Sequence, residues 1–358
     1  MVKSIKILTS AIGFGGYIPA VIVGKQLSSR GIRTSVYVIE KFLSEEKKEV
    51  FRESRVEFRN NNRIAYLASQ LPIDYNAKFE IGAMEKLFDQ WKHEGASTFL
   101  CFSGLWLDVM AAYQDRFGKI DVYCCRMDAT ESSTWKDRRT EMIRETFFFF
   151  DVKKTKINYL LTLPSLVTKP FSSRENSVVI HGGGWGLGNY IHKSNAITST
   201  SFTKKLFIFE KSEFLPDNNN TSFYLNNPNW DPIAEDSGFP PLGQMISHDV
   251  INYIESDEYH AALQVINDSK AIISKPGGMS LLDSIITETP LVYLETAGIN
   301  EEGNKKLLES LDLGISFGRW ADIGFDKEIL NKLNRNLTAV KKEIPDFTSM
   351  FLDQMLIN

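Results

Sequence analysis

The sequence has few of the residues that build disulfide frameworks and metal sites. Of its 358 residues, 3 are cysteine and 5 are histidine. Cys101, Cys124 and Cys125 form neither a disulfide framework nor the spacing of a zinc site. A Gly-x-Ser-x-Gly elbow and a P-loop lysine are also missing. We therefore expect no protein-bound metal and neither of those two catalytic or phosphate-binding devices.

Long apolar runs are absent as well. No stretch reaches the roughly 18 residues that a membrane-spanning helix needs. The first residues lack the apolar core of a signal peptide. We therefore expect a cytoplasmic protein without a transmembrane segment.

The chain carries no large excess of charge of one sign. Its net charge is −4 at pH 7, and basic residues cluster only briefly, at 136–139 and 153–156. A nucleic-acid-binding protein concentrates basic residues into a stripe, so we expect no nucleic-acid partner. With 43% hydrophobic and 24% charged residues, the composition is that of an ordinary globular protein.

What the sequence does contain is an alternation of short apolar strands with helices. Residues 5–11 read as a buried strand, and the glycine-rich residues 13–16 as a turn into a helix that ends near Gly31. Residues 34–39 read as the next strand, and a second alternating set begins with a strand at 177–181. This order of elements predicts an α/β fold with doubly wound parallel sheets.

The length and one polar segment predict two domains. Residues 162–176 contain two prolines and a polar cluster, and we take them as the interdomain linker. We predict Rossmann-like domains at 1–172 and 173–326, with a cleft between them. Residues 327–358 read as a helical tail with a break at Pro345.

Four consecutive phenylalanines, at 147–150, lie either in the protein interior or at a membrane surface. They read as the edge of a buried strand. Contact with a membrane surface is the alternative, but four adjacent aromatic residues point all around a helix and make a poor amphipathic face.

Each half opens with a glycine-rich turn between a strand and a helix, at 13–16 and 182–188. Such turns let backbone N–H groups approach an anion. The first turn matches the nicotinamide fingerprint only in part, because Ile18 takes the last glycine position, although Glu40 follows the second strand as a ribose-binding acid would. A dehydrogenase is therefore not the favoured interpretation.

The segment 271–304 indicates a phosphate-binding site more specifically than the two glycine-rich turns do. A buried strand ends at Ser274 and leads into Lys275-Pro276-Gly277-Gly278, after which Met279 and Ser280 open a helix. The glycines let the backbone wrap a phosphate, and the unpaired N–H groups of the helix point to the same place. Asp283 follows on the same helix and has the chemistry to accept hydrogen bonds from ribose hydroxyls.

This segment resembles the donor motif of GT-B glycosyltransferases, most of all the group of diacylglycerol glucosyltransferases and MurG-type N-acetylglucosaminyltransferases. The group has Gly-Gly-hydrophobic-Thr-x-x-Glu, then a strand, then Gln-x-x-x-Asn. The N-terminal glycine loop and the loop at Gly183, Gly184 and Gly186 resemble the same family. The resemblance implies two Rossmann-like domains, with the acceptor held by the first, a nucleotide-sugar donor by the second, and the tail packed back on the first.

By this resemblance the binding residues are expected as follows. The diphosphate is expected at Gly277, Gly278 and Ser280, the ribose at Asp283, and the sugar at Asn300 and Asn304. Gly15, Gly16, His181, Gly183, Gly184, Lys275 and Met279 complete the expected donor site. A packing role for His181, and simple exposure for Lys275, remain alternatives. Two roles are open for Trp185. Its ring either stacks on a base or a sugar of the donor, or fills space within the protein interior.

The chain departs from the family at the position of the general base. Tyr17 stands where the family has a histidine, and an ordinary tyrosine pKa near 10 makes it a poor base. Asp128 and Glu131 follow a strand that ends near Arg126 and are further candidates, with a solvated turn as the alternative. Asp283 and Asn300 are each one methylene shorter than their family counterparts.

The sequence therefore predicts a metal-independent glycosyltransferase. It would use a nucleotide-diphosphate sugar, with UDP as the expected nucleotide, as a co-substrate rather than a tightly bound cofactor. The acceptor, whether a small molecule, a lipid or a peptide, is not specified. A UDP-sugar hydrolase or epimerase, and a non-catalytic binding protein of the same fold, remain as alternatives.

Overall fold

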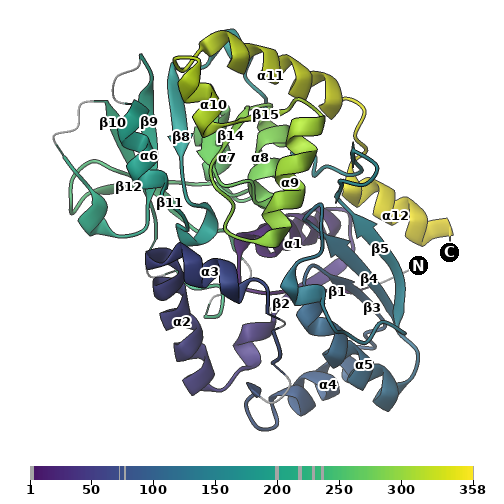
Figure 1. Ribbon diagram of the computed structural model, residues 1–358. Helices are drawn as coiled ribbons and strands as arrows, with labels where there is room; N and C mark the ends of the chain where they lie inside the picture. The colour runs from purple at the N-terminus through teal and green to yellow at the C-terminus, as the bar shows by residue number, and fades with distance from the viewer. Residues whose placement is uncertain are drawn as a thin grey trace.

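The computed structural model describes residues 4–71, 73–75, 78–197, 201–216, 220–227, 230–234 and 238–357. Two sheets, one above the other in Figure 1, form the centres of two halves of the molecule. Helices cover both faces of each sheet, which is the α/β arrangement that the alternating sequence predicts.

The N-terminal sheet is parallel throughout and has the strand order β2-β1-β3-β4-β5. Its strands are β1 (Ser4–Thr9), β2 (Arg33–Val38), β3 (Thr98–Cys101), β4 (Asp121–Arg126) and β5 (Ile143–Phe148). The helices of this half are α1 (Phe14–Ser29), α2 (Glu45–Asn60), α3 (Asn62–Ala68), α4 (Ala83–His93) and α5 (Leu107–Phe117). A small antiparallel pair follows, β6 (Phe150–Asp151) with β7 (Lys156–Ile157).

The C-terminal sheet has the order β12-β11-β10-β9-β8-β13-β14-β15. Its strands are β8 (Ser177–Ile180), β9 (Thr203–Ile208), β10 (Thr221–Asn226), β11 (Leu242–Met245), β12 (Ile251–Ile254), β13 (Ala271–Ser274), β14 (Leu291–Tyr293) and β15 (Gly314–Ser316). Its helices are α6 (Tyr190–Ala196), α7 (Ala262–Asn267), α8 (Gly278–Thr287), α9 (Ile299–Ser310), α10 (Phe317–Asp322) and α11 (Lys327–Lys341). Among the described strands of this sheet, β11 pairs antiparallel with both β10 and β12, at one edge.

The tail is helical on both sides of Pro345, as predicted. Helix α11 ends at Lys341, and α12 (Phe347–Ile357) begins beyond the proline. Helix α12 lies beside β5 of the N-terminal half (Figure 1), and the ring of its Phe351 lies 5.3 Å from that of Tyr123 on the neighbouring strand β4. The chain therefore returns to its first half, which ties the two halves together.

The phenylalanine run is mostly buried. Phe147, Phe149 and Phe150 are each at most 1% exposed, whereas Phe148 is 43% exposed. Phe147 and Phe149 contact Phe347 of α12, at ring distances of 5.4 and 4.9 Å. The prediction of burial is confirmed for three of the four and is wrong for Phe148, because that side chain points to the opposite face of β5.

Candidate functional site

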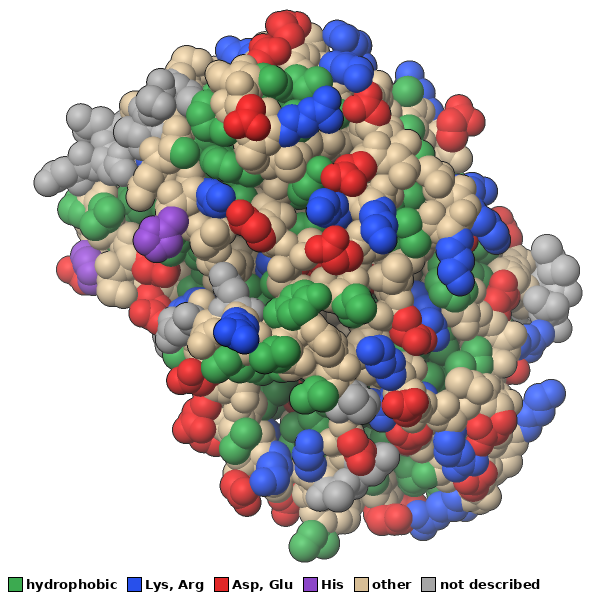
Figure 2. Space-filling view, in the orientation of Figure 1, with side chains coloured by type: hydrophobic (Ala, Val, Ile, Leu, Met, Phe, Trp, Pro, Cys, Tyr) green, Lys and Arg blue, Asp and Glu red, His purple; other side chains and the backbone are tan. Residues whose placement is uncertain are grey.

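A cavity of about 460 Å³ lies between the two halves. Its walls come from the loops that follow the parallel strands of both sheets, which is where ligands bind in α/β proteins. Hydrophobic side chains gather around a hollow at this junction in Figure 2. The loops are residues 10–16 after β1, 102–103 after β3, 127–128 after β4, 181–184 after β8, 275–278 after β13 and 297–301 after β14.

The amino end of α8 opens into this cavity. The helix begins at Gly278, and no side chain caps it at Gly277. The N–H groups of the first helical turn have no partner within a helix, and the helix dipole adds positive potential there. A Cβ added at Gly277 would meet nothing nearer than Glu301 Oε1 at 3.6 Å, so the backbone at this turn is open to an incoming group.

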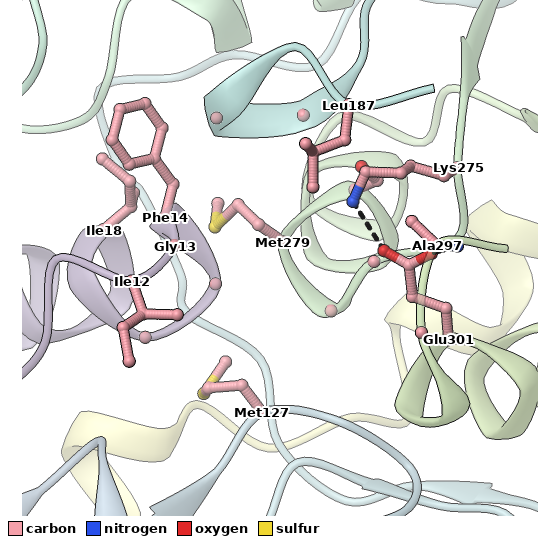
Figure 3. Close-up of a pocket in the computed structure, with 18 of the residues that line it drawn as sticks. Ile12, Gly13, Phe14, Ile18, Met127, Leu187, Lys275, Met279, Ala297 and Glu301 are labelled. Atoms are coloured by element: carbon pink, nitrogen blue, oxygen red, sulfur yellow. Dashed lines mark hydrogen bonds and ion pairs between the residues drawn. The ribbon is translucent and has the colours of Figure 1, made fainter. Parts of the chain in front are cut away.

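Lys275 extends across the same wall. Its Nζ lies 2.6 Å from Glu301 Oε1 (Figure 3), and the other oxygen of Glu301 accepts the backbone N–H of Ala297 at 2.6 Å. Glu301 is only 5% exposed and holds the lysine beside the loop at Gly183. The pair keeps a cation at the mouth of the α8 turn. No local sequence signal marks Glu301, because a glutamate early in a helix is common on any surface.

His181 lines the cavity and carries a buried hydrogen-bond donor without a described partner. The Nδ1 atom of His181 accepts the N–H of Gly183 at 3.0 Å, so the neutral ring carries its proton on Nε2. Nε2 is buried and has no partner among the described residues. Burial first, and then the charges of Lys275 and His260, lower the pKa of His181 to about 3. The ring is therefore neutral at ordinary pH and offers an unpaired N–H.

Asp283 lies on α8, farther from the amino end than Gly278, and is paired with His260. The Nε2 atom of His260 lies 2.9 Å from Asp283 Oδ1, and both side chains line the cavity. Apolar side chains that also line the cavity include Phe207, Leu242, Ala262 and Ile266. His260 was not among the predicted site residues, because nothing in its local sequence marks it. The pairing arises only because the loop before α7 packs against α8.

Asn300 and Asn304 meet Asp128 of the N-terminal half. The Nδ2 atom of Asn300 donates to Asp128 Oδ2 at 3.0 Å, and that of Asn304 donates to Asp128 Oδ1 at 2.9 Å. Burial raises the pKa of Asp128, and the two amide hydrogen bonds oppose that rise. The structure thus brings together two of the predicted sugar-binding residues and one of the predicted bases.

The other two candidate bases lie elsewhere. Tyr17 is fully buried, its hydroxyl donates to the carbonyl of Gly238 at 2.8 Å, and it does not line the cavity. Glu131 accepts a hydrogen bond from Arg126 at 2.8 Å and also lies outside the cavity lining. Of the three, only Asp128 faces the cavity.

The N-terminal glycine loop forms the opposite wall. Gly15 has open space where a Cβ would be, whereas a Cβ at Gly16 would come within 2.9 Å of the carbonyl of Phe102. Ring atoms of Phe14 would lie 2.5 Å from a Cβ at Gly184, so the glycine loops of the two halves touch. Figure 3 shows Met279 of α8 pointing toward Phe14.

Glu40 and Trp185 are two further residues to which the sequence gave a possible ligand contact. Glu40, which a dehydrogenase would use for ribose, is fully buried, and its carboxylate holds the loop after β1 by accepting from Ser10 at 2.5 Å and from the N–H of Ala11 at 2.7 Å. Burial raises the pKa of Glu40. The side chain of Trp185 lies outside the described part of the structure, so neither of its predicted roles is tested.

The described part of the chain contains neither a metal-binding cluster nor a membrane-spanning helix. Among those residues, no group of three or more His, Cys, Asp or Glu side chains is arranged to hold a metal ion. In the same part of the chain, no helix is both long and apolar enough to cross a membrane.

No protein-family model matches the sequence, and no curated protein sequence matches it significantly. Solved structures do match its fold over nearly the whole chain. MurG of Acinetobacter baumannii matches 99% of this chain and 100% of its own, at 12% identity and a TM-score of 0.53.

Two further matches contain nucleotides. One is the spinosyn rhamnosyltransferase SpnG complexed with thymidine diphosphate, at 10% identity, a TM-score of 0.54, and coverage of 99% of this chain and 100% of that one. The other is UGT2 of Phytolacca americana complexed with UDP-2-fluoro-glucose and pterostilbene, at 10% identity, a TM-score of 0.54, and coverage of 99% of both chains. This protein therefore has the GT-B glycosyltransferase fold.

Proposed function

We propose that this GT-B chain is a glycosyltransferase that moves a sugar from a nucleotide-diphosphate donor, with UDP as the nucleotide, to an acceptor bound on the N-terminal side of the cavity. The observation that carries the proposal is that three positive or donating groups belong to residues that line one cavity. These are the uncapped amino end of α8, the ammonium of Lys275 and the unpaired Nε2–H of His181.

These groups have the chemistry to stabilise a departing diphosphate. Negative charge builds up on the leaving group as the bond to the sugar breaks, and fixed donors aimed at that charge lower the barrier. Gly278 and Ser280 would supply backbone N–H groups, whereas the N–H of Gly277 donates to the carbonyl of Lys275 at 2.8 Å. The ammonium of Lys275, although paired with Glu301, would supply further donors. Because the protein provides this positive potential itself, the proposed mechanism is metal-independent.

For the general base we propose Asp128. It faces the cavity, and its Oδ1 lies 3.0 Å from where a Cβ of Gly278 would be, next to the proposed diphosphate position. A raised pKa brings a carboxylate closer to the range in which it accepts a proton effectively. Both of its oxygens are engaged by amides in this structure, so a donor sugar would have to displace Asn300 or Asn304 from it.

The acceptor would lie against the apolar side of the cavity. Phe58, Ala65, Ala68 and Ile73, from the region of α2 and α3, line it there. Such a wall suits a molecule with an apolar body.

Calorimetric titration with UDP, GDP, ADP, dTDP and uridine tests the proposal. We expect UDP to bind most tightly and Lys275→Gln to weaken UDP by about tenfold or more while leaving uridine unchanged, because uridine has no phosphates. Lys305→Gln is the matched control, since Lys305 forms only a surface pair with Glu302 at 3.8 Å. Binding of no nucleotide at all would refute the glycosyltransferase proposal.

One observation favours a second candidate, a non-catalytic nucleotide-binding protein. The amides expected to hold the sugar are occupied by Asp128, and Tyr17 replaces the usual histidine. Nucleotide binding with no turnover of any UDP-sugar would support this candidate. Free sugar or an epimer formed without an acceptor would instead indicate the hydrolase or epimerase.

A further inference from the structure

Glu301 places a carboxylate at the turn that would hold the diphosphate. Its Oε1 atom lies 3.6 Å from where a Cβ of Gly277 would be and 2.6 Å from Nζ of Lys275 (Figure 3). On the other side, Nζ of Lys275 lies 3.6 Å from where a Cβ of Gly183 would be. An anionic side chain therefore lies beside the place proposed for an anionic ligand.

The start of helix α9 fixes this carboxylate in place. The Oε2 atom of Glu301 accepts the N–H of Ala297 at 2.6 Å, and the N–H of Glu301 donates to the carbonyl of Gly298 at 3.1 Å. Ala297 and Gly298 lie just before the helix, which begins at Ile299. Because one oxygen is held by the backbone, the other remains directed at Lys275.

The charge of Lys275 is balanced at this turn. Among the described residues that line the cavity, Lys275 is the only lysine or arginine. The side chains of Lys275 and Glu301 are 14% and 7% exposed, so solvent ions screen the pair only weakly. The pair is also felt on the opposite wall. Burial and two amide hydrogen bonds have the largest effects on the pKa of Asp128, and the charge of Glu301 then raises it while that of Lys275 lowers it.

A balanced lysine treats the two nucleotides of the proposed reaction differently from an unbalanced one. The terminal phosphate of a free nucleoside diphosphate has a second ionisation with a pKa of about 6, which esterification by a sugar removes. The free product therefore carries more negative charge than the donor, and an unbalanced lysine would hold the product more tightly. An acid beside the lysine offsets this difference, while the N–H groups of the ammonium still donate to a phosphate.

We infer that Glu301 cancels the preference of Lys275 for the free nucleoside diphosphate, so that the site binds an esterified diphosphate about as well. The inference rests on the proposed nucleotide site and goes beyond it, because it makes Glu301 a specificity-determining residue for donor over product. Contacts with the sugar then suffice to favour the donor. Released nucleotide does not stay bound and block the next donor.

Titration calorimetry of the whole chain with UDP and its β-methyl ester tests the inference. The methyl group caps the terminal phosphate as a sugar does, but it brings no sugar hydroxyls. At pH 8 we expect the wild type to bind the two ligands within about threefold of each other. Glu301→Gln keeps an oxygen that can accept from Ala297 but removes the charge, so it should bind UDP about tenfold more tightly than the ester.

Two further variants separate charge from structure. Lys275→Gln leaves Glu301 unbalanced and should bind the ester about tenfold more tightly than UDP. The double variant Lys275→Gln/Glu301→Gln restores the balance, so its preference should return to that of the wild type. Glu302→Gln is the matched control, because Glu302 pairs with Lys305 at 3.8 Å and lies outside the cavity lining. It should leave the preference unchanged.

The ionisation of the ligand gives a second readout. At pH 5 the terminal phosphate of UDP keeps its second proton, so UDP and the ester carry the same charge. The preference of Glu301→Gln for UDP should then fall to within about threefold. The other titratable side chains that line the cavity affect both ligands in one protein and cancel in the ratio of their dissociation constants. They are Asp128, Asp283, His181 and His260.

The outcomes distinguish this inference from the proposed function. If the wild type binds UDP at least tenfold more tightly than the ester at pH 8, the inference is wrong while the proposed function stands. The same holds if Glu301→Gln leaves the preference unchanged, as a purely structural role would. If neither ligand binds, both are wrong. The wild type and Lys275→Gln decide the matter even if Glu301→Gln fails to fold.

Discussion

Asp128 and Asn304, 176 residues apart in the sequence, are joined by a hydrogen bond of 2.9 Å between Oδ1 and Nδ2. Asn304 also accepts the N–H of Ala129 at 2.7 Å through its own side-chain oxygen. The contact between the two halves and the expected sugar site therefore use the same atoms. A sugar that binds Asn304 competes with Asp128, so donor binding and separation of the halves are coupled.

Replacing Asp128 should show this competition. We expect Asp128→Ala to lower the free energy of unfolding by about 2 kcal/mol, because it leaves two amide donors without their acceptor. It should also tighten a UDP-sugar relative to UDP, since the competing carboxylate is gone, and slow transfer by about a hundredfold or more if Asp128 is the base. Urea unfolding, calorimetry and turnover measure the three effects.

Glu131→Ala is the control for Asp128→Ala. Glu131 lies in the same loop, but its side chain is 46% exposed and paired with Arg126. An exposed pair contributes little to stability, so no measurable change is expected. An unchanged preference between UDP-sugar and UDP in Asp128→Ala would argue against competition.

Gly278→Ala should interfere with the contact between the halves. The added Cβ would lie 2.5 Å from the carbonyl oxygen of Met127, and a backbone atom cannot move aside as a flexible side chain does. We expect a loss of about 1–3 kcal/mol in the free energy of unfolding, as for overpacked sites in general. Thermal and urea unfolding measure it.

Gly277→Ala, one residue earlier, is the matched comparison. Gly277 has an ordinary φ of −72° and its nearest neighbour would be 3.6 Å from the new Cβ. Stability should therefore be unchanged, while UDP should bind more weakly because the methyl group stands at the open phosphate turn. Equal destabilisation by both variants would contradict the close approach at Gly278.

His181 should make stability depend on pH on the acid side. Its pKa in the folded chain is about 3, below the ordinary value of about 6.5. Between these values the unfolded chain binds a proton that the folded chain does not, so stability falls as the pH is lowered from about 6.5 toward 3. The loss from this group is at most about 1.4 kcal/mol per pH unit.

Urea unfolding of the wild type and His181→Gln at several pH values between 7 and 4 measures this dependence. Burial raises the pKa of Glu40 and Asp128, which acts in the opposite direction but equally in both proteins. The wild type should therefore lose more stability on acidification than the variant. Parallel pH profiles would show that His181 is not a buried neutral histidine.

The phenylalanine run offers a test of the tail packing. Phe149→Ala should destabilise the chain by about 3–5 kcal/mol, since the ring is fully buried against Phe347 of α12 at 4.9 Å. Phe148→Ala, at the neighbouring but 43% exposed position, should cost much less. Equal effects in urea unfolding would contradict this division between the two faces.

Much of this protein follows from its sequence. Apolar strands alternating with helices predicted the α/β fold, and Pro345 marked the break in the tail. The glycines before Met279 predicted a strand-to-helix turn, and helix α8 begins there, at Gly278. These features depend on neighbouring residues alone, because backbone conformation, hydrophobic periodicity and turn chemistry act over a few positions.

The partners of the polar side chains were decided only by the tertiary structure. Asp128 meets Asn304, Tyr17 meets Gly238 across 221 residues, and His260 meets Asp283. Each of these contacts depends on how separate elements dock, and no local pattern records that geometry. Folding selects the partners because a buried polar group that finds none is costly, and the available partner is set by packing rather than by position in the chain.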